Sequence, residues 1–187
     1  MGWDMSITAS MVKELRERSG AGMMDCKRAL EAVDGDIEAA IEHLRKSGIA
    51  KAAKKAGRTA AEGIVVISED DNHVSLLEIN CETDFVANDE NFGAFSSIVA
   101  DAILGNRPKN LDELKKCGTT DGTIDDVTTE LSAKVGEKID IRRYVLVKKE
   151  QSSTGTYLHG KRIGVVVLVE PDNVVVARDV AMHIAAT

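Results

Sequence analysis

Apolar residues recur at helical spacing in three short segments of the first 48 residues. The second segment begins at Met23 or Met24, and the third follows Asp36 and ends at Ser47-Gly48. Residues three and four positions apart lie on the same face of a helix, so each segment can bury one apolar stripe. Asp is a favoured N-cap and Gly a common helix end, which supports these boundaries. The pattern predicts a three-helix module over residues 6–48.

A basic segment follows the three helices. Residues 49–58 have high helix propensity and few large apolar side chains, which predicts an exposed helical connector. Residues 45–58 hold six Lys or Arg and no acid, whereas residues 59–106 hold ten acids and no Lys or Arg. Such a reversal of charge is typical of a boundary between modules or of two differently charged faces. The acidic stretch would also repel the phosphates of a nucleic acid.

Strand patterns appear beyond the basic segment. Two β-rich runs, 64–67 and 74–79, flank the turn-forming residues 69–72 and predict a hairpin. Ile163 to Val169 is apolar almost throughout, which predicts a strand covered on both faces. The other expected elements are a strand over 139–147 and helices over 89–104, 111–116, 124–135 and 174–186.

The second part of the chain, residues 59–187, is therefore predicted to be an α+β core with an antiparallel sheet and flanking helices. A hairpin followed by a helix occurs at 63–104, and a strand pair followed by a helix, less clearly, at 143–187. This weak repetition suggests a first subdomain over 59–142 and the start of a second over 143–187.

The composition is that of a globular protein. Apolar residues make up 43% of the 187 residues, enough for a core, and the formal net charge is −7. The three cysteines form no Cys-x-x-Cys pair, which favours free thiols in a reducing compartment. The sequence has no run of about 20 apolar residues that could span a membrane. A cytoplasmic protein with no membrane partner is expected.

The sequence lacks the motifs of common catalytic and nucleotide-binding sites. No Gly-x-x-x-x-Gly-Lys-[Ser/Thr] is present, and Gly20-Ala21-Gly22 lacks the third glycine and the preceding strand of a dinucleotide site. The four histidines are scattered, with no pair at a metal-ligand spacing. Cys81 closes an apolar strand and is expected to be a small buried residue, not a nucleophile. We expect no enzyme, no cofactor, no metal and no directly bound nucleotide.

Two segments are more specific than any periodicity. They are Leu15-Arg-Glu-Arg-Ser-Gly-Ala-Gly-Met-Met-Asp-Cys-Lys-Arg-Ala-Leu30 and Asn80-Cys-Glu-Thr-Asp-Phe-Val-Ala-Asn88. Both closely resemble the bacterial elongation factor Ts family. The same order continues with Lys51-Ala-Ala-Lys-Lys-Ala-Gly57, Val135-Gly-Glu-Lys-Ile-Asp-Ile-Arg-Arg143, His159-Gly-Lys-Arg-Ile-Gly-Val165 and Ala181-Met-His-Ile-Ala-Ala186. The resemblance covers residues 6–187.

The resemblance implies a module like the ubiquitin-associated domains, a connector, and a core of two related α+β subdomains. It also implies guanine-nucleotide exchange on elongation factor Tu, the GTPase that carries aminoacyl-tRNA to the ribosome, without bond-making chemistry. In the family a phenylalanine, which corresponds to Phe85, wedges near the magnesium site of that GTPase and disturbs its phosphate loop. The partner-binding residues that the resemblance assigns to this chain are Lys13, Met23, Met24, Lys27, Asp84, Phe85, Val86 and His159.

Each of these residues also has a purely structural interpretation. Two methionines at a helix start are more often core than interface, although flexible Met side chains suit a partner groove. Thr83 or Asp84 can simply cap a helix, with Phe85 packed beneath it. The two lysines and the histidine are by default solvated surface residues.

Family members of this arrangement continue beyond the 181–186 motif with a helical hairpin, further strands and a C-terminal module that this sequence does not contain. An incomplete sheet would leave an exposed edge, which favours association into a homo-oligomer. Two other functions remain open, a scaffold that docks on the GTPase without nucleotide exchange and an RNA-binding module that uses the basic stretch 45–58. No aromatic residue interleaves the lysines of that stretch, so nucleic acid is not the expected partner.

Overall fold

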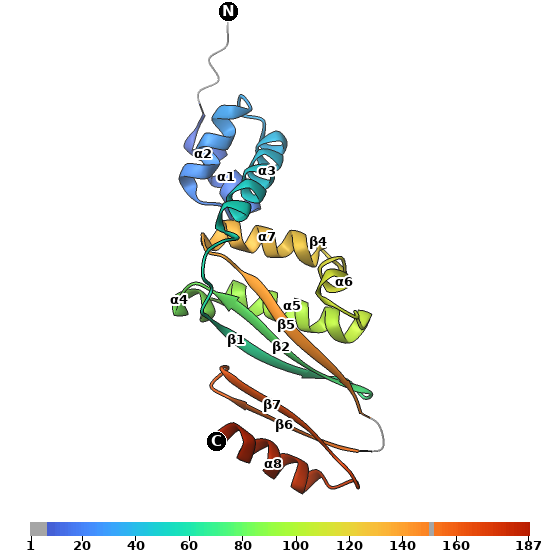
Figure 1. Ribbon diagram of the computed structural model, residues 1–187. Coiled ribbons are helices and arrows are strands. Elements are labelled where there is room, and N and C mark those ends of the chain that lie inside the picture. The colour runs from blue at the N-terminus through green and yellow to red at the C-terminus, as the bar shows by residue number, and fades with distance from the viewer. Residues whose placement is uncertain (1–6, 150–151) are drawn as a thin grey trace, which may run out of the picture. The chain divides into compact units, whose positions relative to one another are not determined.

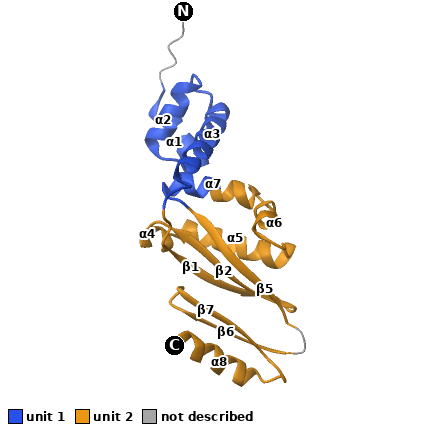
Figure 2. Ribbon diagram, viewed as in Figure 1, with its two compact units in different colours: residues 1–58, 129–138 blue, residues 59–128, 139–187 orange. Residues whose placement is uncertain are grey.

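The computed structural model describes residues 7–149 and 152–187 of the chain. The chain divides into two compact units, residues 1–58 with 129–138 and residues 59–128 with 139–187 (Figure 2). Helices occur in both units, and the antiparallel strands of the described residues all lie in the second unit (Figure 1). The predicted α+β class is confirmed.

The first unit is built around three helices, α1 (Ala9–Ser19), α2 (Met23–Ala32) and α3 (Ile37–Lys55). The Thr8 hydroxyl accepts a hydrogen bond from the Met11 amide at 3.3 Å, and the Asp36 carboxylate accepts one from the Ala39 amide at 2.9 Å. These two N-caps begin α1 and α3, and Asp36 is the cap that the sequence predicted for the third helix. The helices enclose a small core of Leu15, Cys26, Ala29, Leu30 and Ala40. Ser6, the first residue of the expected module, lies outside the described residues.

Helix α3 does not end at Ser47-Gly48, so that prediction was wrong; it continues to Lys55. Gly48 is buried, and a Cβ at this position would lie 3.2 Å from the Cβ of Ala133 in α7 (Ile124–Val135). This close contact of α3 with α7 accounts for a glycine that costs about 1 kcal/mol inside a helix. The Lys55 ammonium is buried as well, and it donates to the backbone oxygen of Ser132 at 3.0 Å. The expected connector is therefore the end of α3, and it is exposed only in part.

The second unit contains a three-stranded antiparallel sheet (Figure 1). Its strands are β1 (Glu62–Glu69), β2 (His73–Cys81) and β5 (Asp140–Lys148), in the order β1-β2-β5. The predicted hairpin and the predicted strand over 139–147 are confirmed. Because β5 pairs with β2 from Asp140 to Lys148, the subdomain division expected near residue 143 falls inside a strand of this sheet.

Three helices that contact this sheet lie between β2 and β5 along the chain. They are α4 (Asp84–Ala87), α5 (Glu90–Asn106) and α6 (Leu111–Lys115), and a short hairpin of β3 (Gly118–Thr119) and β4 (Gly122–Thr123) precedes α7. The predicted helices over 89–104, 111–116 and 124–135 are confirmed. Helix α5 contacts β1 and β2, and its buried side chains include Phe92, Phe95, Val99 and Ile103.

The last elements are the hairpin of β6 (Ser153–His159) and β7 (Ile163–Val169) and the helix α8 (Val174–Ala186). The sequence predicted β7 and α8 but not β6. Helix α8 lies directly on β6, because a Cβ at Gly155 would lie 2.1 Å from the carbonyl oxygen of Ala177. The prediction that β7 is covered on both faces was wrong. Among the described strands β7 pairs with β6 alone, and its Ile163 and Leu168 are exposed.

Candidate protein-binding surfaces

The segment after β2 turns sharply into the short helix α4. The Thr83 hydroxyl accepts a hydrogen bond from the Val86 amide at 3.4 Å, and the Cys81 thiol, which is fully buried, donates to the Thr83 carbonyl at 3.1 Å. Thr83 is thus the N-cap of α4, and Asp84 occupies the first helical position, where a carboxylate favours the helix dipole. These local bonds fix the direction of the side chains that follow.

Phe85 projects away from the protein. Its side chain is 86% exposed, whereas the adjacent Val86 and Ala87 are buried. The interpretation in which Phe85 packs beneath the helix is therefore wrong. Val86 lies under the surface that carries Asp84 and Phe85, so its own side chain is covered by the chain. A fully exposed Phe forgoes roughly 1.5–3 kcal/mol of hydrophobic stabilisation, which a partner could recover by covering it.

Two methionines project from the start of α2. Met23 is 59% exposed and Met24 is 62% exposed, so neither side chain belongs to the core of the first unit. The residues that α2 buries are Cys26, Ala29 and Leu30. Adjacent methionines at a helix start form a flexible, polarisable apolar surface.

The two lysines that the resemblance assigns to partner binding belong to the same unit as this methionine surface. Lys27 lies on α2 and Lys13 on α1, and both are exposed. Each ammonium lies 3.7 Å from a glutamate one helical turn later, Glu31 and Glu17 respectively. Exposed pairs of this kind contribute little to stability, so both cations are accessible to a partner.

His159 ends β6 in the second unit and is exposed. Its ring stacks with that of Tyr157, with ring centroids 6.2 Å apart. The Tyr157 hydroxyl and His159 Nδ1 lie 3.3 Å apart and share a hydrogen bond. The tyrosine therefore orients the imidazole, a contact that the sequence did not predict.

The eight predicted residues are divided between the two units. Those on α1 and α2 belong to the first unit, and those on α4 and β6 belong to the second. Within the described ranges, 7–149 and 152–187, no group of three or more His, Cys, Asp or Glu is placed to hold a metal ion. Nor does any helix in those ranges have the length and apolar character needed to cross a membrane. Phe85 on α4 and the adjacent Met23 and Met24 on α2 are the exposed apolar side chains among the eight, and a protein partner that covered them would remove apolar surface from water.

Comparison with known proteins identifies the family. The family model described as elongation factor TS matches residues 82–187. The chain is 50% identical over 183 residues to elongation factor Ts of Idiomarina loihiensis, which covers 98% of this chain and 62% of that protein. For the elongation factor Ts of Legionella pneumophila the identity is 51% over 185 residues, with 97% and 63% covered. The chain belongs to the elongation factor Ts family, and it spans less than two thirds of the length of these relatives.

Proposed function

We propose that this chain acts in translation elongation by binding the GTPase elongation factor Tu and promoting the release of its GDP. The observation that carries the proposal is the exposure of Phe85, at 86%, on a capped helix within the segment that the family model matches. A large apolar side chain held in this way suits insertion between side chains of a partner. Its adjacent residue Asp84 is exposed and supplies a negative charge at the same place.

The energetics favour a distributed mechanism. Each tenfold loss of nucleotide affinity requires about 1.4 kcal/mol of coupling free energy. Burying one Phe provides roughly 1.5–3 kcal/mol, so Phe85 alone would account for about one or two factors of ten. We propose that the methionine surface of Met23 and Met24 and the imidazole of His159 supply further contacts, which add affinity for the GTPase and hold it while Phe85 acts.

The test is the rate at which labelled GDP leaves elongation factor Tu. It is measured with the intact chain, with Phe85→Ala, and without any factor. We expect the intact chain to raise the rate and Phe85→Ala to lose most of the increase. A rate equal to the spontaneous rate with the intact chain would contradict exchange. Full activity of Phe85→Ala would contradict the role of Phe85.

A second candidate function is docking on the GTPase without exchange. It is favoured by the exposed Met23 and Met24 of the first unit, which can bind the GTPase without any contribution from Phe85. A fluorescence binding assay beside the exchange assay distinguishes the two. Docking alone predicts a saturable complex in which GDP leaves at its spontaneous rate.

A further inference from the structure

Helix α4 carries Phe85, yet it is too short to hold that residue by itself. It spans four residues, Asp84–Ala87, whereas isolated helices shorter than about 12 residues are marginal in water. Contacts with the segments on either side must therefore fix its conformation. The direction of the Phe85 side chain depends on the same contacts, because that side chain is 86% exposed and is held by little packing of its own.

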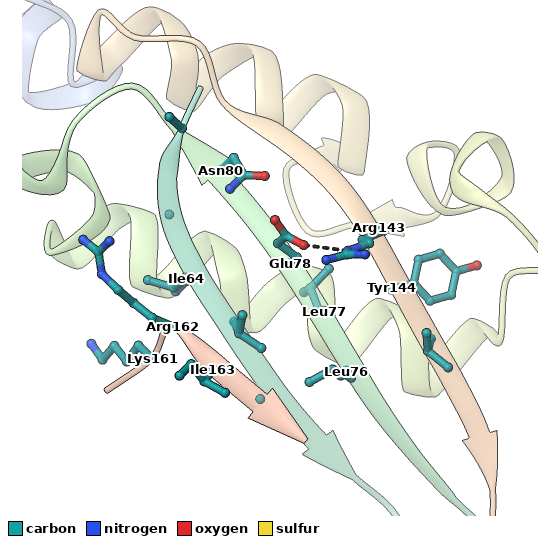
Figure 3. Close-up of a pocket in the computed structure, with 15 residues that line it drawn as sticks. Ile64, Leu76, Leu77, Glu78, Asn80, Arg143, Tyr144, Lys161, Arg162 and Ile163 are labelled. Atoms are coloured by element: carbon teal, nitrogen blue, oxygen red, sulfur yellow. Dashed lines mark hydrogen bonds and ion pairs between the residues drawn. The ribbon is translucent and has the colours of Figure 1, made fainter. Parts of the chain in front are cut away.

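The strand that precedes α4 is anchored at its end. Asn80 lines the pocket drawn in Figure 3, near the end of β2, and its side-chain amide donates to the Glu62 carbonyl of β1 at 3.0 Å. The next residue, Cys81, is fully buried, and its thiol donates to the Thr83 carbonyl at 3.1 Å. That carbonyl also accepts the Ala87 amide at 3.1 Å. One acceptor thus joins the end of the strand to the first turn of the helix.

The helix that follows α4 begins almost at once. Asp89 is the N-cap of α5, and its own amide donates to the Val86 carbonyl at 3.0 Å. Val86 and Ala87 are buried, and α4 contacts β1, β2 and α5. The short helix is therefore held between a strand and a helix of 17 residues, with its exposed side directed away from both.

Asn88 adds a hydrogen bond that acts on the peptide group next to Phe85. Its side-chain amide donates to the Asp84 carbonyl at 2.8 Å, and its backbone amide donates to the same oxygen at 3.1 Å. This oxygen belongs to the peptide group that joins Asp84 to Phe85. Because a peptide group is planar, holding its oxygen also restrains the Phe85 amide and the Cα that carries the phenyl side chain. Asn88 is itself exposed, so this bond is not part of the core.

We propose that Asn88 is a positioning residue for Phe85 in nucleotide exchange. By holding the Asp84 carbonyl, Asn88 keeps the exposed phenyl ring in one direction before the GTPase arrives. Less conformational freedom is then lost when the partner covers the ring. The inference rests on the proposed function, because Phe85 must act on the GTPase for its direction to matter.

The first test is the maximal rate of GDP release from elongation factor Tu at saturating concentrations of the chain. Asn88→Ala should lower the factor-dependent part of this rate about three- to fivefold, as expected for the loss of one hydrogen bond. The matched control is Asn106→Ala, which should leave the rate unchanged. Asn106 is also exposed, and its side-chain amide donates to the Ala102 carbonyl at 3.1 Å. This bond is of the same kind, but it lies at the far end of α5, a helix about 25 Å long. An equal loss in the control would overturn the inference.

A double variant shows whether Asn88 acts through Phe85. Without the phenyl ring Asn88 has nothing to position, so Phe85→Ala combined with Asn88→Ala should retain the same residual rate as Phe85→Ala alone. A further loss in the double variant would mean that Asn88 has a separate role, and it would overturn the inference. Full activity of Asn88→Ala beside an impaired Phe85→Ala would contradict this inference alone. Full activity of Phe85→Ala would contradict the proposed function and the inference with it.

Amide hydrogen exchange tests the same bond without the GTPase. In Asn88→Ala the amides of residues 86–88 should exchange at least threefold faster than in the parent, because local opening of α4 becomes more frequent. The amides of residues 95–103 in α5 should exchange as in the parent. Unchanged exchange at residues 86–88 would show that the side chain of Asn88 does not hold α4, and it would overturn the inference whatever the rate of GDP release.

Discussion

Phe85 and Phe95 are side chains of the same kind that differ in burial. Phe95 is buried in α5, whereas Phe85 is exposed on α4. We predict that Phe95→Ala lowers the free energy of unfolding by about 3–5 kcal/mol because it leaves a cavity. Phe85→Ala should change it by less than about 0.5 kcal/mol, as is usual for an exposed site. Urea denaturation followed by circular dichroism measures both.

The opposite ranking would have a definite meaning. If Phe85→Ala were the more destabilising substitution, Phe85 would pack against this chain in solution. The proposed contact of Phe85 with a partner would then have to be abandoned. A small effect of Phe85→Ala on stability makes any loss of exchange in that variant interpretable as a lost contact with the GTPase.

At the level of elements, one ion pair links α2 to α3 and should make the first unit sensitive to acid. The Asp25 carboxylate accepts a hydrogen bond from the Lys51 ammonium at 3.0 Å, and Arg28 lies at 2.9 Å. The hydrogen bond from Lys51, followed by the charges of both cations, lowers the pKa of Asp25 below its ordinary value of 3.8. Because the folded pKa is the lower one, the pair stabilises the fold fully above the ordinary value. That contribution is lost as the pH falls through the folded pKa.

Asp25→Asn tests this link between the two helices. The variant should lose less unfolding free energy than the parent between pH 5 and pH 2, by up to about 1 kcal/mol for a partly exposed pair. Thermal unfolding at a series of pH values measures the difference. Glu14→Gln removes the same charge from α1, where Glu14 forms no ion pair with any described residue, and should follow the parent. Parallel pH profiles of parent and Asp25→Asn would rule out the contribution.

The contact of α8 with β6 depends on a glycine. A Cβ at Gly155 would lie 2.1 Å from the Ala177 carbonyl oxygen, and backbone atoms cannot move aside as a flexible side chain can. Gly155→Ala should therefore separate α8 from the hairpin and raise amide hydrogen exchange in both. Gly93→Ala is the matched control, because a Cβ at Gly93 in α5 meets nothing within 4 Å. It should stabilise the protein by about 0.5–1 kcal/mol. Unchanged protection of α8 in Gly155→Ala would contradict the close approach.

Local chemistry made most of the elements predictable. Helix α5 begins at its Asp89 cap, and α7 and α8 occupy the predicted ranges. Strand β6 was missed because its polar sequence has no strand pattern of its own, and its pairing with β7 defines it. The end of α3 was misplaced because Ala133, far along the chain, accommodates Gly48. The exposure of Phe85 could not be predicted from periodicity, since a four-residue helix has too few positions to define a buried face.

At the scale of the whole molecule, the candidate contacts are divided between two units. The methionine surface lies in the first unit, and Phe85 lies in the second. A factor that weakens GDP binding by some ratio must itself be bound more weakly, in the same ratio, when GDP is present. Contacts whose free energy is the same with and without bound GDP contribute only to the affinity for the GTPase. Contacts that are stronger in the GDP-free state promote GDP release.

We assign the contact of Met23 to affinity and the contact of Phe85 to exchange, and the two assignments predict different kinetic defects. Met23→Asp places a charge in an apolar contact and should raise the factor concentration needed for half-maximal GDP release. The increase should be about tenfold for each 1.4 kcal/mol of binding free energy that is lost. The maximal rate of GDP release should be retained. The helix should persist, because an acid in the first turn of α2 favours its dipole. Phe85→Ala should instead lower the maximal rate, which extra factor would not restore. Titrating each variant against labelled GDP bound to elongation factor Tu separates the two. If Met23→Asp lowered the maximal rate and Phe85→Ala only shifted the midpoint, the two units would have exchanged roles, and the part proposed for Phe85 would be wrong.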